Sequence, residues 1–172
     1  MSNSESTPRQ RQIVEFIEKL GRLDAAGRAR LKRNAGRTLG EARDVHRVFY
    51  QALPYTVAGR SFEEEAYFLV ATLFPLADPR STPVSLAATL RRVRQSRDSA
   101  SLDRRFQTLL DSEREHLPFR LRQAVRLAAA SEQPIAWGQL LTDLLAWDHP
   151  DHYIQLRWAR DYFVGYAEAE AV

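Results

Sequence analysis

The sequence predicts an all-α protein built from two small helical bundles joined by a short linker. Apolar residues recur at the three- and four-residue steps of amphipathic helices along most of the chain. No stretch alternates apolar and polar residues as a half-buried strand would. The segments between the periodic stretches are short, as in helical bundles. A chain of 172 residues with 44% hydrophobic residues is long enough to bury a core.

The first bundle is predicted over residues 1–95, where several helices carry recognisable start signals. Thr7 and Pro8 fit the cap and first position of a helix, and Asp24 is a good cap for the next one. Ser61 followed by Glu64 fits a capping box. The predicted helices of this bundle cover residues 8–20, 24–35, 42–53, 61–73 and 86–93.

The polar, turn-prone segment Gln95–Ser101 is the predicted linker, and the second bundle spans residues 96–172. Trp137, Trp147 and Trp158 lie at helical spacing among leucines, which favours core packing over base stacking. The predicted helices of this bundle cover residues 102–110, 117–128, 137–145 and 151–166.

The chain is basic, with a net charge of +3 and a pI of about 9.5. Arginine supplies all but two of the 25 basic residues. Residues 28–47 hold seven basic against two acidic residues, and residues 91–126 hold ten arginines against five acidic residues. Separate basic zones are typical of a surface that binds a polyanion. Arginine-rich helices that only face solvent have the same composition, so composition alone leaves both interpretations open.

No motif of a known catalytic or cofactor site is present. The absence of cysteine excludes disulfides, thiolate nucleophiles and Cys-ligated metal sites. The segment Gly36–Gly40 follows a helix rather than a strand and lacks the Gly-Lys-Ser/Thr ending of a P-loop. We therefore expect a protein that is not an enzyme and uses no cofactor.

His149 and His152 are the one place where imidazoles and carboxylates crowd together, beside Asp148 and Asp151. Such a group could in principle hold a metal ion. The four residues lie at a helix junction, however, where aspartate is a good cap, and capping is the favoured interpretation. An enzyme that uses the two histidines is the less favoured alternative, and no metal site is predicted.

No apolar run reaches the roughly 18 residues of a membrane-spanning helix, and the polar N-terminus lacks a secretory signal. We therefore expect a cytoplasmic protein without a membrane partner.

The arginine clusters are the most informative feature, because each lies on a helix that also has an apolar face. The helix after Leu117 buries Leu121 and Val125 and carries Arg122 and Arg126 four residues apart on another face. Guanidinium groups bind phosphate oxygens in a bidentate manner, whereas base reading needs a groove-entering element that the sequence does not reveal. The predicted binding is therefore to the nucleic-acid backbone, independent of sequence and sensitive to salt.

Four segments of the C-terminal half form a recognisable pattern: Phe106–Arg114, Leu121–Leu127, Trp137–Trp147 and Gln155–Arg160. A weaker pattern earlier in the chain is Leu23–Arg33 followed by Phe49 and Tyr50. In these segments the chain resembles the small subunit of the type I-E CRISPR surveillance complex, the CasB family of Cascade.

The resemblance implies a non-catalytic, all-α subunit whose basic surfaces stabilise target DNA and the displaced strand in the R-loop. It implies as partners the crRNA, the target DNA, the backbone and large subunits of the complex and a second copy of the chain. The positions that match the family's basic residues are Lys32, Arg33, Arg104, Arg105, Arg120 and Arg122. Arg28, Arg37 and Arg126 are added because they neighbour these on helix faces.

The alternative function is a purely structural spacer whose arginines contact acidic faces of partner proteins. Arg157 and Arg160 are expected to bond to protein carboxylates in either case, because they alternate with Trp158 and Asp161.

Overall fold

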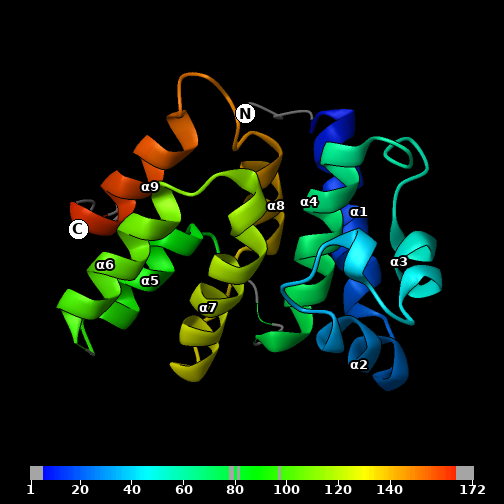
Figure 1. Cartoon of the computed structure of the whole chain (residues 1–172), viewed down its shortest axis with the longest axis horizontal. Helices are drawn as coiled ribbons and strands as arrows, with labels where there is room; N and C mark the ends of the chain where they lie inside the picture. Colours follow the sequence, from blue (N-terminus) through cyan, green and yellow to red (C-terminus); the bar gives the residue numbers. More distant parts are fainter. Residues whose placement is uncertain (1–5, 78–79, 81, 97, 166–172) are drawn as a thin grey trace, which may run out of the picture.

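The computed structural model describes residues 6–77, 80, 82–96 and 98–165. Within these ranges the chain is helical and contains no strand, which confirms the predicted all-α fold (Figure 1). None of the described helices is long and apolar enough to cross a membrane. The α-helices are α1 Pro8–Gly21, α2 Ala25–Arg33, α3 His46–Ala52, α4 Ser61–Leu73, α5 Leu86–Arg94, α6 Ser99–Leu110, α7 Leu117–Ala130, α8 Trp137–Leu145 and α9 Tyr153–Phe163. The short 3-10 helices are η1 Leu39–Glu41, η2 Phe74–Leu76 and η3 Arg114–His116.

The first two helices begin as their sequences predict. The Thr7 hydroxyl accepts from the Gln10 N–H at 3.3 Å, and the Thr7 N–H donates to the Gln10 side chain at 2.7 Å. The Asp24 carboxylate accepts from the Gly27 N–H at 2.7 Å, so it caps α2. Such side-chain caps satisfy N–H groups that have no partner inside the helix.

Three predicted helix starts are wrong. Ser61 lies inside the first turn of α4, and Glu64 instead accepts from the Gly59 N–H at 2.6 Å, so no capping box forms there. The helix predicted from residue 42 begins only at His46, because Asp44 adopts a left-handed backbone with φ of 54°. Helix α6 begins at Ser99, inside the predicted linker.

The ninth predicted helix is shorter at its start than the sequence suggests. It begins at Tyr153 rather than Asp151, and its described part ends at Phe163. The predicted end at Tyr166 lies outside the described residues.

The packing interleaves the two halves of the sequence. Helix α5 packs against α9, α7 and α6, whereas α8 packs against α4 and α1. The buried side chains form one continuous cluster that includes the predicted core tryptophans Trp137, Trp147 and Trp158. The division at residue 95 remains a prediction about independent folding units, and the described core is shared across it.

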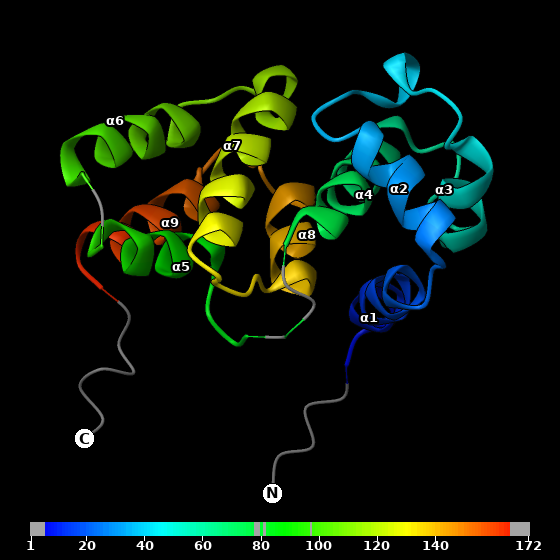
Figure 2. The same cartoon turned by 90° about the horizontal axis from the view of Figure 1, so that it is seen from below.

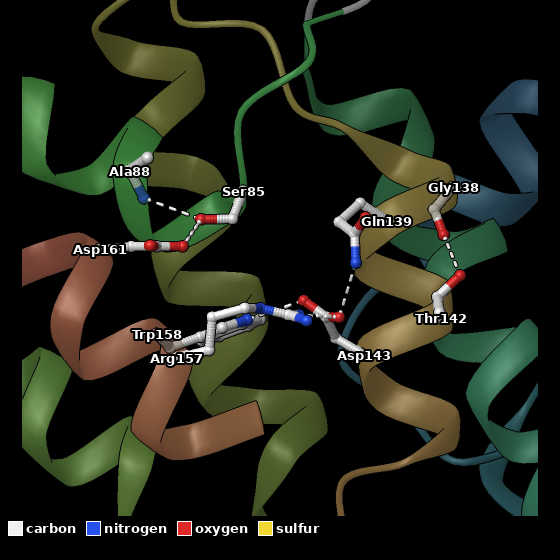
Figure 3. Close-up of polar contacts among 9 residues, drawn as sticks. All are labelled: Ser85, Ala88, Gly138, Gln139, Thr142, Asp143, Arg157, Trp158 and Asp161. Atoms are coloured by element: carbon white, nitrogen blue, oxygen red, sulfur yellow. Dashed lines mark hydrogen bonds and ion pairs between the residues drawn. The ribbon is translucent and has the colours of Figure 1, made fainter. Parts of the chain in front are cut away.

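A buried carboxylate joins α8 to α9 (Figure 3). Asp143 is 1% exposed, accepts from the indole N–H of Trp158 at 2.7 Å and forms an ion pair with Arg157. Gln139 donates to the same carboxylate at 2.8 Å. The ion pair confirms the expectation that Arg157 bonds to a protein carboxylate. Because a buried charge is costly without partners, these bonds fix the position of α8 against α9.

Two further polar contacts hold α5 within the C-terminal group. The Ser85 hydroxyl caps α5 by accepting from the Ala88 N–H at 3.2 Å, and it donates to Asp161 of α9 at 2.7 Å (Figure 3). Asp103 of α6 accepts from Arg94 at 2.7 Å and from the Tyr162 hydroxyl at 2.7 Å. The hydrogen bond from Arg94, and then that from Tyr162, lowers the pKa of the Asp103 carboxyl.

We predict that Asp143→Ala destabilises the protein by about 2–4 kcal/mol, because the Trp158 N–H and the Arg157 guanidinium both lose their buried acceptor. Asp143→Asn should cost less, since its amide oxygen still accepts from Trp158. Urea unfolding measures both free energies.

Asp148→Ala is the matched control, because it also removes an aspartate–arginine pair, here with Arg114, at a side chain that is 49% exposed. It should cost about 0–1 kcal/mol. Equal losses for Asp143→Ala and Asp148→Ala would contradict the role assigned to the buried carboxylate.

Candidate nucleic-acid interface

All nine predicted binding residues lie on three helices and one turn. Figure 2 shows α2, α6 and α7 along one side of the molecule and α1 and α5 along the opposite side. Arg28, Lys32 and Arg33 belong to α2, Arg37 to the turn that follows it, Arg104 and Arg105 to α6, and Arg120, Arg122 and Arg126 to α7. Two basic zones that are far apart in the sequence thus lie on elements of one side.

The basic residues of α2 differ in how far their charges are compensated. Arg30 and Arg33 share the carboxylate of Asp44, at 3.4 and 3.8 Å. Lys32 is exposed and forms no ion pair within the part of the chain that the structure describes. Exposed ion pairs contribute little to stability, so Arg33 can leave the Asp44 carboxylate and bind a phosphate at a small cost in free energy. Lys32 can bind a phosphate without breaking any ion pair.

The turn after α2 is held by Asn34, which is 1% exposed. Its amide group donates to the carbonyl oxygens of Arg30 and Arg43 at 2.8 and 2.9 Å, and its oxygen accepts from the Arg43 N–H at 2.9 Å. Leu39 donates its N–H to Glu65 of α4 at 3.1 Å. These bonds fix the loop that carries Arg37.

Gly36 lets this turn approach α7. Its φ of 83° is in the left-handed region, and a Cβ at this position would lie 2.8 Å from the Arg122 Cδ atom. Arg122 is half-buried there, and its Nε atom has no hydrogen-bond partner. The structure therefore brings Arg122 beside the turn that carries Arg37, with Arg126 exposed one turn further along α7.

Arg104, Arg105 and Arg120 line one groove between α6 and α7, with a cavity of about 300 Å³. Arg104 and Arg105 are exposed, and their guanidinium groups have no partner among the described residues. Arg120 differs, because it donates to the Thr108 carbonyl at 2.6 Å and to the Ser112 hydroxyl at 2.7 Å. Arg120 thus fastens the end of α6 to α7, while Arg104 and Arg105 remain available to an anion.

Arg28 lies apart from both groups. It lines a separate cavity with Ile17 of α1 and Trp137 of α8, and its Nε atom has no hydrogen-bond partner. The structure therefore does not join Arg28 to the groove between α6 and α7.

Phe119 is a residue of this groove that the sequence analysis missed. It lines the same cavity as Arg104 and Arg105, and it is 60% exposed. The signal was present in the sequence, because Phe119 lies off the buried stripe formed by Leu117, Leu121 and Val125. A large aromatic residue on the polar face of an arginine-rich helix is the pattern that would have singled it out.

Comparison with known proteins decides the family. The family model for the CRISPR-associated protein Cse2 matches residues 27–163 of this chain. The chain belongs to the Cse2 family.

Individual relatives agree with this assignment. The CRISPR-associated protein Cse2 of Thermus thermophilus is 40% identical over 121 residues, which cover 68% of each chain. A crystal structure of CasB from Thermus thermophilus has a TM-score of 0.75 and 34% identity, covering 92% of this chain and 99% of that one. A chain of a CRISPR RNA-guided surveillance complex has a TM-score of 0.76 at 20% identity, covering 91% and 94%, and shares the fold. The resemblance to the CasB family is therefore confirmed.

All nine candidate residues lie inside the segment that matches the Cse2 family, and so do the two histidines.

His149 accepts from the Asp151 N–H through Nδ1 at 3.2 Å, and Asp148 pairs with Arg114. Neither aspartate caps α9, whose cap position is His152 with φ of 48°, so the predicted capping role is wrong. Among the described residues no group of three or more His, Asp or Glu side chains could hold a metal ion.

We predict that Gly36→Ala destabilises this Cse2-family protein by about 1–2 kcal/mol or more, because alanine is strained at positive φ. Its methyl group would also displace Arg122. Thermal unfolding checks the loss of stability, and nucleic-acid binding should weaken with the displaced arginine.

Gly40→Ala is the control, since a Cβ there meets no atom within 4 Å and the φ of Gly40 is not positive. It should change the stability by no more than about 0.5 kcal/mol. A Gly36→Ala variant as stable as Gly40→Ala would show that the turn does not depend on this close approach.

Proposed function

We propose that this chain is a non-catalytic small subunit of a type I-E CRISPR RNA-guided surveillance complex that binds nucleic-acid backbone through its basic side. There it stabilises the target DNA and the displaced strand in the R-loop. Membership of the Cse2 family supports the place in the complex. The single observation that carries the binding role is that the exposed, unpaired basic residues Lys32, Arg104, Arg105 and Arg126 belong to α2, α6 and α7, helices that lie along one side of the molecule (Figure 2).

The energetics of R-loop formation suit such a surface. Replacing a DNA duplex with a guide–target duplex is nearly balanced in free energy, so modest contacts to the backbone can tip the equilibrium. Guanidinium groups bind phosphates without reading the bases, which fits a subunit that must accept any target. The partners proposed are the crRNA and target DNA, the backbone and large subunits of the complex, and a second copy of this chain.

A structural spacer is the second candidate, and a second surface favours it. A cavity of about 990 Å³ lies between α4, α7 and α8, where Arg114 stacks over the exposed ring of Phe62 at 5.2 Å. The acidic residues around it are Glu65, Asp111, Glu113, Glu115 and Asp148. The acidic residues outnumber the two arginines that also line this cavity, Arg37 and Arg114, so the apolar cavity suits a protein partner better than a nucleic acid. Arg37 of the basic surface also lines this cavity, so the two proposed surfaces meet at that residue, and one subunit can perform both roles.

We predict that Arg104→Gln together with Arg105→Gln weakens binding of single-stranded DNA and lowers the steepness of its salt dependence. Each lost phosphate contact reduces the slope of log Kobs against log salt by about 0.7 for a single strand, so the pair should remove about 1.4. Titrations of the free protein at several salt concentrations measure the slope.

Arg9→Gln together with Arg92→Gln is the matched control, because both side chains are exposed on α1 and α5, outside the proposed surface. It removes the same charge and should leave the slope nearly unchanged. Equal effects of the two double variants would indicate general attraction to a basic protein. Absence of salt-dependent binding by the wild-type chain, with assembly lost when the arginines are replaced, would favour the spacer.

A further inference from the structure

The groove between α6 and α7 combines an apolar interior with a cationic rim. Its cavity is lined by the apolar residues Leu102, Phe106, Leu109 and Leu127 and by Arg104, Arg105 and Arg120. A second cavity of about 370 Å³ adjoins it and shares Leu102, Arg105 and Leu127. The groove is therefore larger than the first cavity alone, and Arg105 contributes to both parts. Phosphate binding by itself would not need the apolar part.

Phe119 lies at this groove without serving the core. Its ring is 60% exposed, whereas Leu121 and Val125 on the same helix are fully buried. Single exposed apolar residues are common on protein surfaces, but this one borders a cavity beside two unpaired cations. Gln123, one turn after Phe119 on α7, lines the same cavity and offers an exposed amide. The groove thus presents an aromatic face, a hydrogen-bonding amide and positive charge together.

We propose that this groove binds a single-stranded nucleotide segment, with an unpaired base stacked on Phe119 and neighbouring phosphates bound by Arg104 and Arg105. Base–aromatic stacking tolerates any sequence, because every base has a π-face. A base in a duplex is already stacked between its neighbours, so only an unpaired strand can use the ring. This inference rests on the proposed function and specifies that, at this groove, the nucleic acid is single-stranded.

The charges of the groove favour a nucleic acid over a protein as its occupant. Arg104 and Arg105 have no carboxylate partner among the described residues, and the neighbouring Asp103 is occupied by Arg94 and Tyr162. Arg120 is already bonded to Thr108 and Ser112, so it shapes the wall and is not counted as a phosphate ligand. A strand that carries one phosphate for each base matches this alternation of ring and cation.

Binding of oligothymidylate and of a duplex of equal length to Phe119→Ala tests the proposal at fixed, low salt. We expect the variant to bind oligothymidylate about 5- to 150-fold more weakly, the loss that corresponds to one stacked base. Duplex binding should change by no more than about twofold, and the salt slope should remain that of the wild type. Because the ring is exposed, the thermal unfolding of Phe119→Ala should match that of the wild type.

Two conservative variants separate stacking from simple apolar contact. Phe119→Trp should restore single-strand binding, and its exposed indole should give a fluorescence signal that oligothymidylate quenches. Phe119→Leu keeps an apolar side chain without a π-face and should not restore binding. Tyr55→Ala removes an aromatic ring that is 90% exposed but lies outside the groove, and it should leave both affinities unchanged.

The outcomes distinguish this inference from the proposed function. If Phe119→Ala leaves single-strand binding intact while the Arg104/Arg105 double variant loses it, the stacking proposal is wrong and the basic surface stands. Equal weakening of single-strand and duplex binding also overturns stacking. If neither variant affects nucleic acid but Phe119→Ala impairs assembly with the protein subunits, the ring is a protein contact and both proposals fail at this groove.

Discussion

The fold depends on the way that α8 is held inside it. This helix packs against α4 and α1, yet its buried Asp143 is bonded to Trp158 and Arg157 of α9 (Figure 3). A carboxylate that is 1% exposed tolerates few alternative positions, because each would leave a charge without partners in a medium of low polarity. The N-terminal helices and the C-terminal group therefore share one core among the described residues. The positions of α2, α6 and α7 relative to one another follow from this shared core.

That constraint explains how two separate basic segments can serve one surface. The turn after α2 reaches α7 through the close approach of Gly36 to Arg122. The Asn34 side chain fixes the following loop by donating to the Arg43 carbonyl oxygen. Like charges placed near one another repel, so a protein that needed only stability would have little reason to gather them. The uncompensated cations at Lys32, Arg104 and Arg105 therefore support the proposed anionic ligand.

The sequence predicts the helices well where the signal is local. The period of the apolar residues and the caps at Thr7 and Asp24 depend only on neighbouring residues, and both are confirmed. The wrong starts come from a side-chain bond and a backbone conformation that the apolar period does not indicate. Ser61 does not form the predicted capping box, because Glu64 accepts from the Gly59 N–H instead. The helix predicted from residue 42 begins later, because Asp44 has a left-handed backbone.

The candidate surface could be predicted as a list of residues but not as an arrangement. Helical periodicity indicates that Arg104, Arg105 and Arg120 avoid the core, yet it cannot indicate that Arg120 bonds back to Thr108 and Ser112. Nor can it indicate that Arg28 lies away from the groove between α6 and α7. Arg28 instead lines a cavity with Trp137, which belongs to a helix far later in the sequence. These distinctions depend on which helices are neighbours, and that is decided by tertiary packing.

Phe119 shows what such an arrangement adds to a count of charges. A surface of cations alone attracts duplex and single strand alike, since both carry phosphates. An aromatic ring beside those cations can discriminate, because stacking is available only to a base that has lost its neighbour in the helix. Where strand exchange is nearly balanced, a contact that stabilises only the unpaired state shifts the balance toward it by the whole of its free energy. The same cations without the ring would stabilise the closed duplex as well, and part of their effect on the open loop would cancel.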